Sequence, residues 1–329
     1  MVAERKVIMK VKILVTVAAG MMLMACETAV AAEDKVFTSS GQIVDGEEWN
    51  NVSIYNDDTI VDMLGGLVDR MQTYDASTIN VTAGDVSTLE AHEFSTANVS
   101  GGYVYTLWAR DSGTVNLSDS GSVSAVSARG SFSLANMYGG SAHWVDALNS
   151  GSINLYGGIV SDYISAPDGT IDIFGYDLSK ASIGGRYGFG VVTGYWSDGS
   201  SFNIDLLSPE TYSHINLFEA VYIELNIRPH TLNLHAKGKF VTCRIQLPKE
   251  YNVNDINPDT ILIERRFKAE WKWYNEKQNI IMARFKRSQL SSILEPGDVD
   301  LIVNCHLIDG TYFEGTDTIK VIDKSQRSR

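Results

Sequence analysis

The chain has 329 residues, with 27 Lys and Arg against 40 Asp and Glu, a formal net charge of −13 at pH 7, and three cysteines. This length favours two folded units over one. A hydrophobic content of 44% excludes wholesale disorder, and a charged content of 20% is too low for a long coiled coil. The acidic balance argues against nucleic acid as the main partner, because phosphate backbones attract Lys and Arg.

The first 31 residues are typical of an export signal. Four basic residues lie between positions 5 and 12, and residues 13–25 form an uncharged, largely apolar stretch that is too short to cross a bilayer. Two cleavage sites compete. A lipobox-like sequence at Leu23–Cys26 would leave Cys26 lipidated at the mature N-terminus, whereas cleavage after Ala29–Ala31 would release a soluble protein. We therefore expect an exported protein, secreted or lipid-anchored in the bacterial cell envelope, with no transmembrane anchor.

Charge and glycine divide the remaining chain into two parts. Residues 36–220 contain 22 acidic and only five basic residues, together with 23 of the 28 glycines. Residues 221–329 contain 14 acidic and 17 basic residues. This change of composition predicts one domain over 36–220 and a second over 221–323, followed by a disordered tail at 324–329.

The first part contains an 18- or 19-residue repeat. Each repeat has a small residue at an equivalent position: Gly65, Ala83, Gly101, Ser120, Gly139, Gly157 and Gly175. Three or four residues earlier lies a polar residue between two apolar ones: Asp62, Asn80, Asn98, Asn116, Asn136, Asn154 and Asp172. An apolar–polar–apolar segment predicts a strand with its flanking side chains turned inward.

A repeat of this length predicts a β-solenoid. Eighteen residues are too few for a βαβ unit or a propeller blade, but they suit one coil of a parallel β-helix of about seven coils. In such a stack the Asn side chains can form hydrogen bonds from amide to amide. The irregular sequences at 41–58 and after Gly175 predict atypical end coils that protect the open sheet edges.

The second part predicts an immunoglobulin-like β-sandwich. Seven short alternating segments are separated by turn residues, at 221–227, 231–234, 240–247, 260–264, 280–285, 299–307 and 316–322. Cys243 and Cys305 lie in two of these segments. They are candidates for a disulfide, which an oxidising compartment would permit, and two buried free thiols are the equal alternative.

Two resemblances follow from these sequences. Thr231–Leu234, Ile245–Pro248 and Asp309–Ile319 resemble parts of a small domain that recurs in exported bacterial and archaeal proteins, and the match covers nearly all of 223–323. Related domains often carry an Asp-rich, calcium-binding loop, but residues 273–279 lack most of the carboxylates, so calcium is not implied here. The solenoid resembles repeats of exported bacterial surface proteins. Neither family implies an activity.

Carboxylates and aromatic residues are the candidate functional groups of the solenoid. Asp75, Glu93 and Asp111 fall on successive coils, where they are either ordinary turn residues or a weak site for a cation such as Ca²⁺. Arg110, beside Asp111, is the nearby base that a pectate-lyase-like enzyme would need. The aromatic residues that look exposed are Tyr103, Tyr105, Trp108, Trp144 and Tyr163, and they could stack on sugars.

The sequence therefore favours a non-enzymatic structural or adhesive protein of the cell envelope or extracellular space. Its expected partners are extracellular polysaccharides or other cell-surface proteins. The alternative is a protein that binds polysaccharide or cleaves it as a lyase or glycoside hydrolase. No catalytic residue and no cofactor follow from the sequence.

Overall fold

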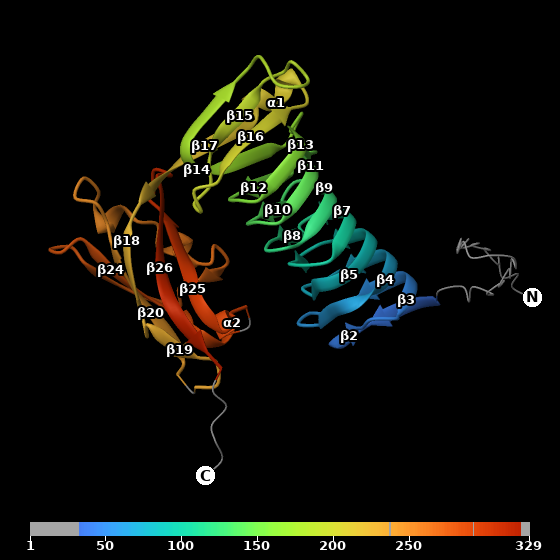
Figure 1. Cartoon of the computed structure of the whole chain (residues 1–329), viewed down its shortest axis with the longest axis horizontal. Helices are drawn as coiled ribbons and strands as arrows, with labels where there is room; N and C mark the ends of the chain where they lie inside the picture. The colour runs from blue at the N-terminus through green and yellow to red at the C-terminus, as the bar shows by residue number, and fades with distance from the viewer. Residues whose placement is uncertain (1–32, 237, 292, 324–329) are drawn as a thin grey trace, which may run out of the picture.

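A computed structural model describes residues 33–236, 238–291 and 293–323. Within these residues the fold is all-β, with a parallel solenoid of about seven turns followed by a second β unit (Figure 1). The predicted export signal with Cys26 and the predicted tail at 324–329 lie outside the described residues.

Parallel strands stacked in register form the solenoid. They are β1 (Glu33–Phe37), β2 (Gly41–Ile43), β3 (Glu48–Ile54), β4 (Ile60–Thr73), β5 (Thr78–Ala91), β6 (Thr96–Val99), β7 (Tyr103–Arg110), β8 (Thr114–Leu117), β9 (Ser122–Arg129), β10 (Leu134–Met137), β11 (Ser141–Leu148), β12 (Ser152–Leu155), β13 (Ile159–Ser165) and β14 (Thr170–Ala181). The short strands β6, β8, β10 and β12 form one ladder between β5 and β14, and β7, β9, β11 and β13 continue a second ladder from β5.

The predicted columns are confirmed by the packing. Apolar residues on each side of the polar column, such as Ile79 and Val81, are fully buried in the solenoid core. In the polar column the amide of Asn98 donates to Asn80 at 2.8 Å, Asn116 donates to Asn98 at 2.8 Å, and Asn136 donates to Asn116 at 2.9 Å. Identical side chains therefore bond along the axis because each coil repeats the one before.

The backbone conformation of the two turns in each coil explains which residue types occur there. At the glycine turn, Gly102 has φ +70°, and a Cβ there would lie 2.5 Å from the carbonyl oxygen of Gly84 on the preceding coil. The opposite turn uses the left-handed conformation, with residues at φ between 52° and 108°: Asp75, Glu93, Asp111, Gly130 and Asn149. Gly, Asn and Asp adopt this conformation at the lowest cost.

The C-terminal end of the solenoid is closed by antiparallel strands. Strands β15 (Val191–Tyr195) and β16 (Ser201–Leu206) follow β14 as antiparallel neighbours, and β16 pairs in parallel with β13. The short helix α1 (Pro209–Ser213) leads into β17 (Ile215–Tyr222). The predicted end of the regular repeat after Gly175 is thus where the chain leaves the solenoid path.

Two sheets around a second apolar core form the C-terminal unit. Its elements are β18 (Glu224–Arg228), β19 (Thr231–Asn233), β20 (Phe240–Gln246), η1 (Val253–Asp255), η2 (Pro258–Thr260), β21 (Leu262–Ile263), β22 (Phe267–Lys268), β23 (Trp271–Asn275), β24 (Ile280–Lys286), α2 (Arg287–Ser291), β25 (Gly297–His306) and β26 (Tyr312–Ile322). One sheet is antiparallel with the order β18-β20-β24-β23, whereas β19 pairs in parallel with β26. The seven predicted segments correspond to strands, although the first spans the end of β17 and most of β18, and β22 and β23 were not predicted.

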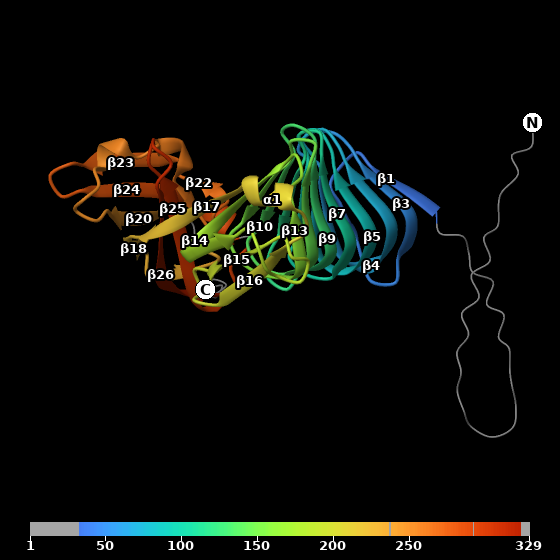
Figure 2. The ribbon, with the colours of Figure 1, turned by 90° about the horizontal axis from the view of Figure 1, so that it is seen from above.

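Strand β17 belongs to both units. Its residues 215–219 pair with β14 of the solenoid, and its residues 220–222 pair with β26 of the C-terminal unit. Side chains seal this joint: Phe174 of the solenoid stacks on Phe218 at 4.7 Å and contacts Tyr312 at 4.9 Å. Figure 2 shows the C-terminal unit at this end of the solenoid, with the first coils at the opposite end.

A buried ion pair lies in the same joint. The guanidinium of Arg265 bonds to Glu314 at 2.8 Å and to Ser197 of the solenoid at 2.6 Å, and it lies 5.3 Å from the ring of Tyr156. Because the side chains of Arg265 and Glu314 are at most 7% exposed, these contacts fix the joint in one geometry.

Candidate functional site

One outer face of the solenoid carries two adjacent rows of polar and aromatic side chains. The first row, in register across the coils, is Gln72, Glu90, Trp108, Ser127, Asp146 and Ser165. The second is Arg70, Thr88, Thr106, Ala125, Trp144 and Tyr163. Because alternate residues of a strand share one face, the two rows lie side by side. We call the surface formed by these rows, with Arg110 and Arg129, the outer aromatic face.

Glu90 is the electrostatic centre of this face. Its side chain is 1% exposed and accepts hydrogen bonds from Arg70 at 2.8 Å, Arg110 at 3.1 Å and Gln72 at 2.8 Å, and it lies 3.3 Å from His92. Burial alone would raise the pKa of Glu90, but the hydrogen bonds from His92 and Arg70 and the charge of Arg110 outweigh it and lower the pKa to about 2. The carboxylate is thus permanently ionised near neutral pH.

Trp108 lies between two arginines. The guanidinium carbon of Arg110 is 4.2 Å from the centre of the Trp108 ring, and that of Arg129, on the next coil, is 5.0 Å away. Cation–π contacts of this kind hold the indole in place. The ring remains partly exposed, so one of the largest aromatic surfaces of the solenoid is both ordered and accessible.

Aromatic rings continue the face toward the C-terminal end of the solenoid. Trp144 stacks on Tyr163 at 6.3 Å with 15° between the ring planes, and Tyr163 meets Tyr187 edge to face at 5.8 Å. Asp162 accepts hydrogen bonds from the Tyr187 hydroxyl at 2.5 Å and from Arg186 at 2.6 Å. The segment between β14 and β15 thereby closes this end of the face.

The predicted sugar-stacking residues do not all lie together. Trp108, Trp144 and Tyr163 share the outer aromatic face. Tyr103 and Tyr105 lie on a different surface, because the alternation of buried and exposed residues in β7 is interrupted between Tyr105 and Thr106. The Tyr103 hydroxyl lies 2.6 Å from Ser124. The structure therefore divides the predicted cluster into two facets.

The candidate cation ligands at the turns contact neighbouring groups of the chain. The carboxylate of Asp75 accepts from the amide of Asn56 at 2.8 Å, and that of Glu93 accepts from the amide of Asp75 at 3.2 Å. Asp111 contacts His92 at 3.3 Å. Among the described residues, no group of three or more His, Cys, Asp or Glu side chains is arranged to hold a metal ion. Asp75 and Glu93 therefore bond to backbone amides, and Asp111 contacts a side chain.

The two carboxylates in the first row of the outer aromatic face are too far apart for the acid–base pair of a glycosidase. Glu90 and Asp146 lie in the same row three strands apart, which corresponds to about 14 Å. Glycosidases place their two carboxyl groups about 5–9.5 Å apart. Burial raises the pKa of Asp146, opposed by Ser165 and Arg129, and Arg110 is bonded to Glu90.

The two cysteines are free and buried in the core of the C-terminal unit. Cys243 lies on β20 and Cys305 on β25, each 0% exposed. Burial raises the pKa of Cys305 to about 12 and raises that of Cys243 as well. The alternative of two free thiols on separate strands is the one that this structure contains.

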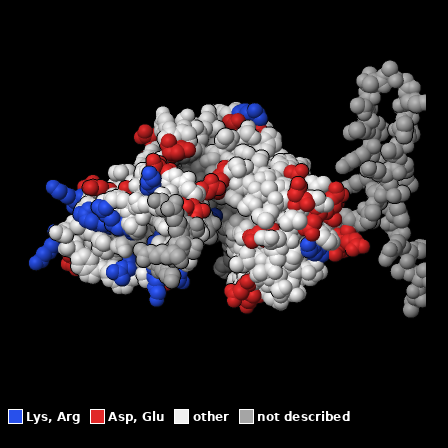
Figure 3. All heavy atoms as spheres, turned by 60° about the horizontal axis from the view of Figure 1, so that its bottom comes forward, with Lys and Arg blue, Asp and Glu red and all other residues white. Residues whose placement is uncertain are grey.

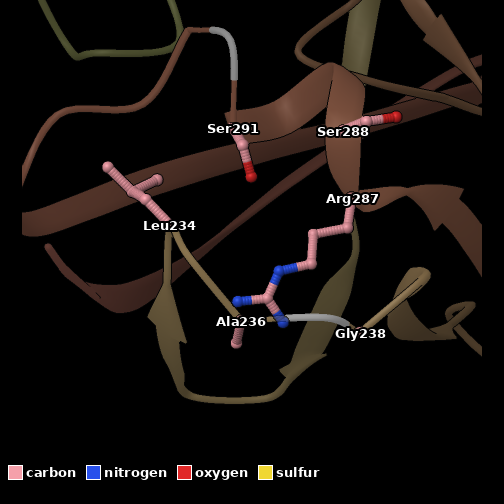
Figure 4. A pocket seen from close by; sticks show the side chains of 6 residues that line it. All are labelled: Leu234, Ala236, Gly238, Arg287, Ser288 and Ser291. Atoms are coloured by element: carbon pink, nitrogen blue, oxygen red, sulfur yellow. The ribbon is translucent and has the colours of Figure 1, made fainter. Parts of the chain in front are cut away.

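Two hollows lie elsewhere on the molecule. One, of about 430 Å³, lies between the β19–β20 loop and α2 and is lined by Leu234, Arg287 and Ser291 among others (Figure 4). The guanidinium of Arg287 donates to the carbonyl of Asn233 and so ties this loop to α2. The other, of about 590 Å³, lies beside the glycine turns of the first coils, where Leu64 and Leu67 are exposed among acidic residues.

Comparison with known proteins gives no relative. No family model, no curated protein and no solved structure matches this chain. In the described part of the chain no helix has the length and apolar character needed to cross a membrane; α1 and α2 have five residues each.

Sequence reasoning missed several residues of the site. Glu90, Arg70, Arg129 and Tyr187 were not singled out, because no feature of the linear repeat distinguishes them from solvated charges or turn residues. The signal that was present is compositional. Of the five basic residues in 36–220, four lie on or beside the outer aromatic face: Arg70, Arg110, Arg129 and Arg186.

Proposed function

We propose that this protein is a non-catalytic adhesive scaffold that acts outside the cell and binds a neutral polysaccharide along the outer aromatic face. The single observation that carries the proposal is the run of partly exposed, ordered rings Trp108, Trp144 and Tyr163 on one sheet face. Such rings stack on the apolar faces of sugars, while neighbouring Thr, Ser and Arg groups bond to hydroxyls.

Charge favours a neutral ligand on this face. Arg70 and Arg110 are paired with Glu90, and Arg186 is paired with Asp162, so most of the positive charge is already balanced. The surrounding solenoid is strongly acidic, which would repel an anionic chain. Figure 3 shows Asp and Glu gathered over the solenoid, whereas Lys and Arg gather over the C-terminal unit.

The same proposal has three further parts: the protein is not an enzyme, it is exported, and its C-terminal unit has an immunoglobulin-like arrangement. Support for a non-catalytic role comes from the ionised state of Glu90 and the separation of Glu90 from Asp146. Support for export comes from residues 1–31. Support for the arrangement comes from the antiparallel β18 sheet and its shared core with β25 and β26.

Binding to a panel of neutral oligosaccharides, measured by calorimetry, tests the proposal. We expect Trp108→Ala and Trp144→Ala each to lower the affinity about tenfold, because truncating a central aromatic contact costs more than about 1 kcal/mol. Tyr105→Ala is the matched control, since it removes an exposed ring from the other facet of the same strand. Equal losses in all three variants would contradict the proposed site.

Two further measurements test the remaining parts. A reducing-end assay on neutral and acidic polysaccharides should detect no turnover, and turnover abolished by Asp111→Ala would replace the scaffold with a polysaccharide-cleaving enzyme, either a lyase or a glycoside hydrolase. Palmitate labelling of cells that express the chain, with and without Cys26→Ala, distinguishes a lipid anchor from a soluble secreted form. Label that disappears in the variant would establish the anchor.

A further inference from the structure

The outward face of the antiparallel sheet β18-β20-β24-β23 combines tryptophan with unneutralised arginine. Trp271 and Trp273 project from the edge strand β23 and are 45% and 48% exposed. Their side chains share one face, because residues two apart in a strand point the same way. The exposed ring of Phe240 on β20 adds to it. We call this surface the β23 face.

Strand register aligns these groups in two lines across the sheet. Trp271 lies opposite Arg284, which lies opposite Thr242 and then Arg228. Trp273 lies opposite Met282, which lies opposite Arg244 and then Asn226. Each line crosses four strands, or about 14 Å, with an aromatic ring at one end; the first line carries two guanidinium groups and the second carries one.

The arginines of this face are held by neutral groups. Arg228 donates to Asn226 at 2.9 Å, and Arg244 donates to Gln246 at 2.8 Å. The guanidinium of Arg284 lies 4.7 Å from the centre of the Trp271 ring. Lys286 differs, since it is paired with Glu270 at 2.8 Å. Among the described residues none of these three guanidinium groups forms an ion pair, and Glu224, which shares this face of β18, lies opposite Gln246.

We propose that the β23 face binds a linear polyuronate, a polysaccharide that carries a carboxylate on each sugar. Guanidinium forks bind carboxylates through two parallel hydrogen bonds, and the tryptophans stack on sugar rings. This inference goes beyond the proposed function, because it concerns a different unit of the chain and an acidic ligand in place of a neutral one. Together the two surfaces would let one molecule bridge a neutral and an acidic polysaccharide.

A membrane surface is the competing occupant of a face with Trp and Arg. The rings are about half exposed, and the Arg284 guanidinium lies 4.7 Å from the Trp271 ring, so charged and aromatic groups lie side by side on this face. A chain with a carboxylate on each sugar ring matches this arrangement, whereas insertion into a membrane surface needs the apolar side chains gathered apart from the charged ones. The experiment therefore includes vesicles as a separate arm.

The test uses the full chain with a hexamer of galacturonate as the probe and calorimetry at low salt. We expect the double variant Arg244→Gln with Arg284→Gln to lower the affinity by at least tenfold and to weaken its salt dependence, because two guanidinium groups that would bind carboxylates are removed. Trp271→Ala with Trp273→Ala should also lower it by at least tenfold. The matched control, Lys249→Gln with Lys277→Gln, removes the same charge from exposed positions outside these strands and should change the affinity less than threefold.

Three results would overturn the inference. They are no binding of the hexamer by the unaltered chain, equal losses in the control and the β23-face variants, and binding to phosphatidylglycerol vesicles in place of the hexamer. Trp144→Ala keeps this test separate from the proposed function, since it should lower binding of neutral oligosaccharides and leave hexamer binding unchanged. Circular dichroism of each variant establishes that it is folded.

Discussion

Replacing Glu90 by Gln should destabilise the solenoid because the carboxylate holds the outer aromatic face together. Glu90 is 1% exposed, and its pKa falls from 4.5 to about 2 on folding, through its contacts with His92, Arg70 and Arg110. A depression of this size corresponds to about 3 kcal/mol of folding free energy. The substitution keeps the shape of the side chain and removes the charge, so we expect a loss of about that magnitude near pH 6.

The loss of stability in Glu90→Gln should depend on pH in a defined direction. A carboxyl with a depressed pKa stabilises the folded state above its unfolded pKa, and that contribution is lost as pH falls through the folded value. The free-energy difference between the unaltered chain and Glu90→Gln should therefore be fully present above pH 4.5 and should decline toward pH 2. The neighbouring His92 has a raised pKa through its contact with Glu90, which adds to the difference in slightly acidic solution.

Urea unfolding of the full chain, followed by tryptophan fluorescence and circular dichroism, measures the difference at several pH values. The matched control is Glu93→Gln, because Glu93 is exposed at the following turn and its replacement keeps an acceptor for the amide of Asp75. We expect the control to change stability by less than about 0.5 kcal/mol. A loss below about 1 kcal/mol for Glu90→Gln at pH 6, or one that is constant down to pH 2.5, would refute the reasoning.

Three further predictions concern the fold. Gly102→Ala should lower the free energy of unfolding by about 1–3 kcal/mol, because its Cβ would lie 2.5 Å from a carbonyl oxygen of the preceding coil. The control Gly199→Ala, with φ +80° and open space around the residue, should lower it by about 1 kcal/mol. Equal effects of the two substitutions in urea unfolding would contradict the predicted contact. Asn116→Ala should cost about 1–3 kcal/mol in the same assay, because it breaks two hydrogen bonds of the Asn column, and an unchanged midpoint would show that water replaces them. In the Cys26→Ser chain, Cys243 and Cys305 should resist alkylation at pH 8 until urea unfolds the protein, because both are buried with raised pKa values; rapid labelling of the native chain would contradict this.

The sequence indicated the aromatic residues of the candidate site but not the carboxylate at its centre. Trp108, Trp144 and Tyr163 could be found because large aromatic residues stand out in a repeat of small ones. Glu90 could not, since its importance lies in its contacts with Arg70, Gln72 and Arg110, which come from the two coils on either side of it. Conversely, the acidic turn residues stand out in the sequence as a column, and the structure adds that Asp75, Glu93 and Asp111 share a left-handed conformation and that Asp75 and Glu93 bond to backbone amides.

The sequence by itself determined the coil of the solenoid. An 18- or 19-residue period fixes which side chains lie above one another, so the buried columns, the Asn column and the turn positions follow from local spacing alone. Only the tertiary structure decided which residues contact one another across strands and between the two units. Strand β17 is shared by both units, Arg265 and Glu314 pair within the joint, and Trp271 and Arg284 meet on adjacent strands. These contacts join residues that are distant in sequence or on separate strands, and no periodic pattern encodes which of them will meet.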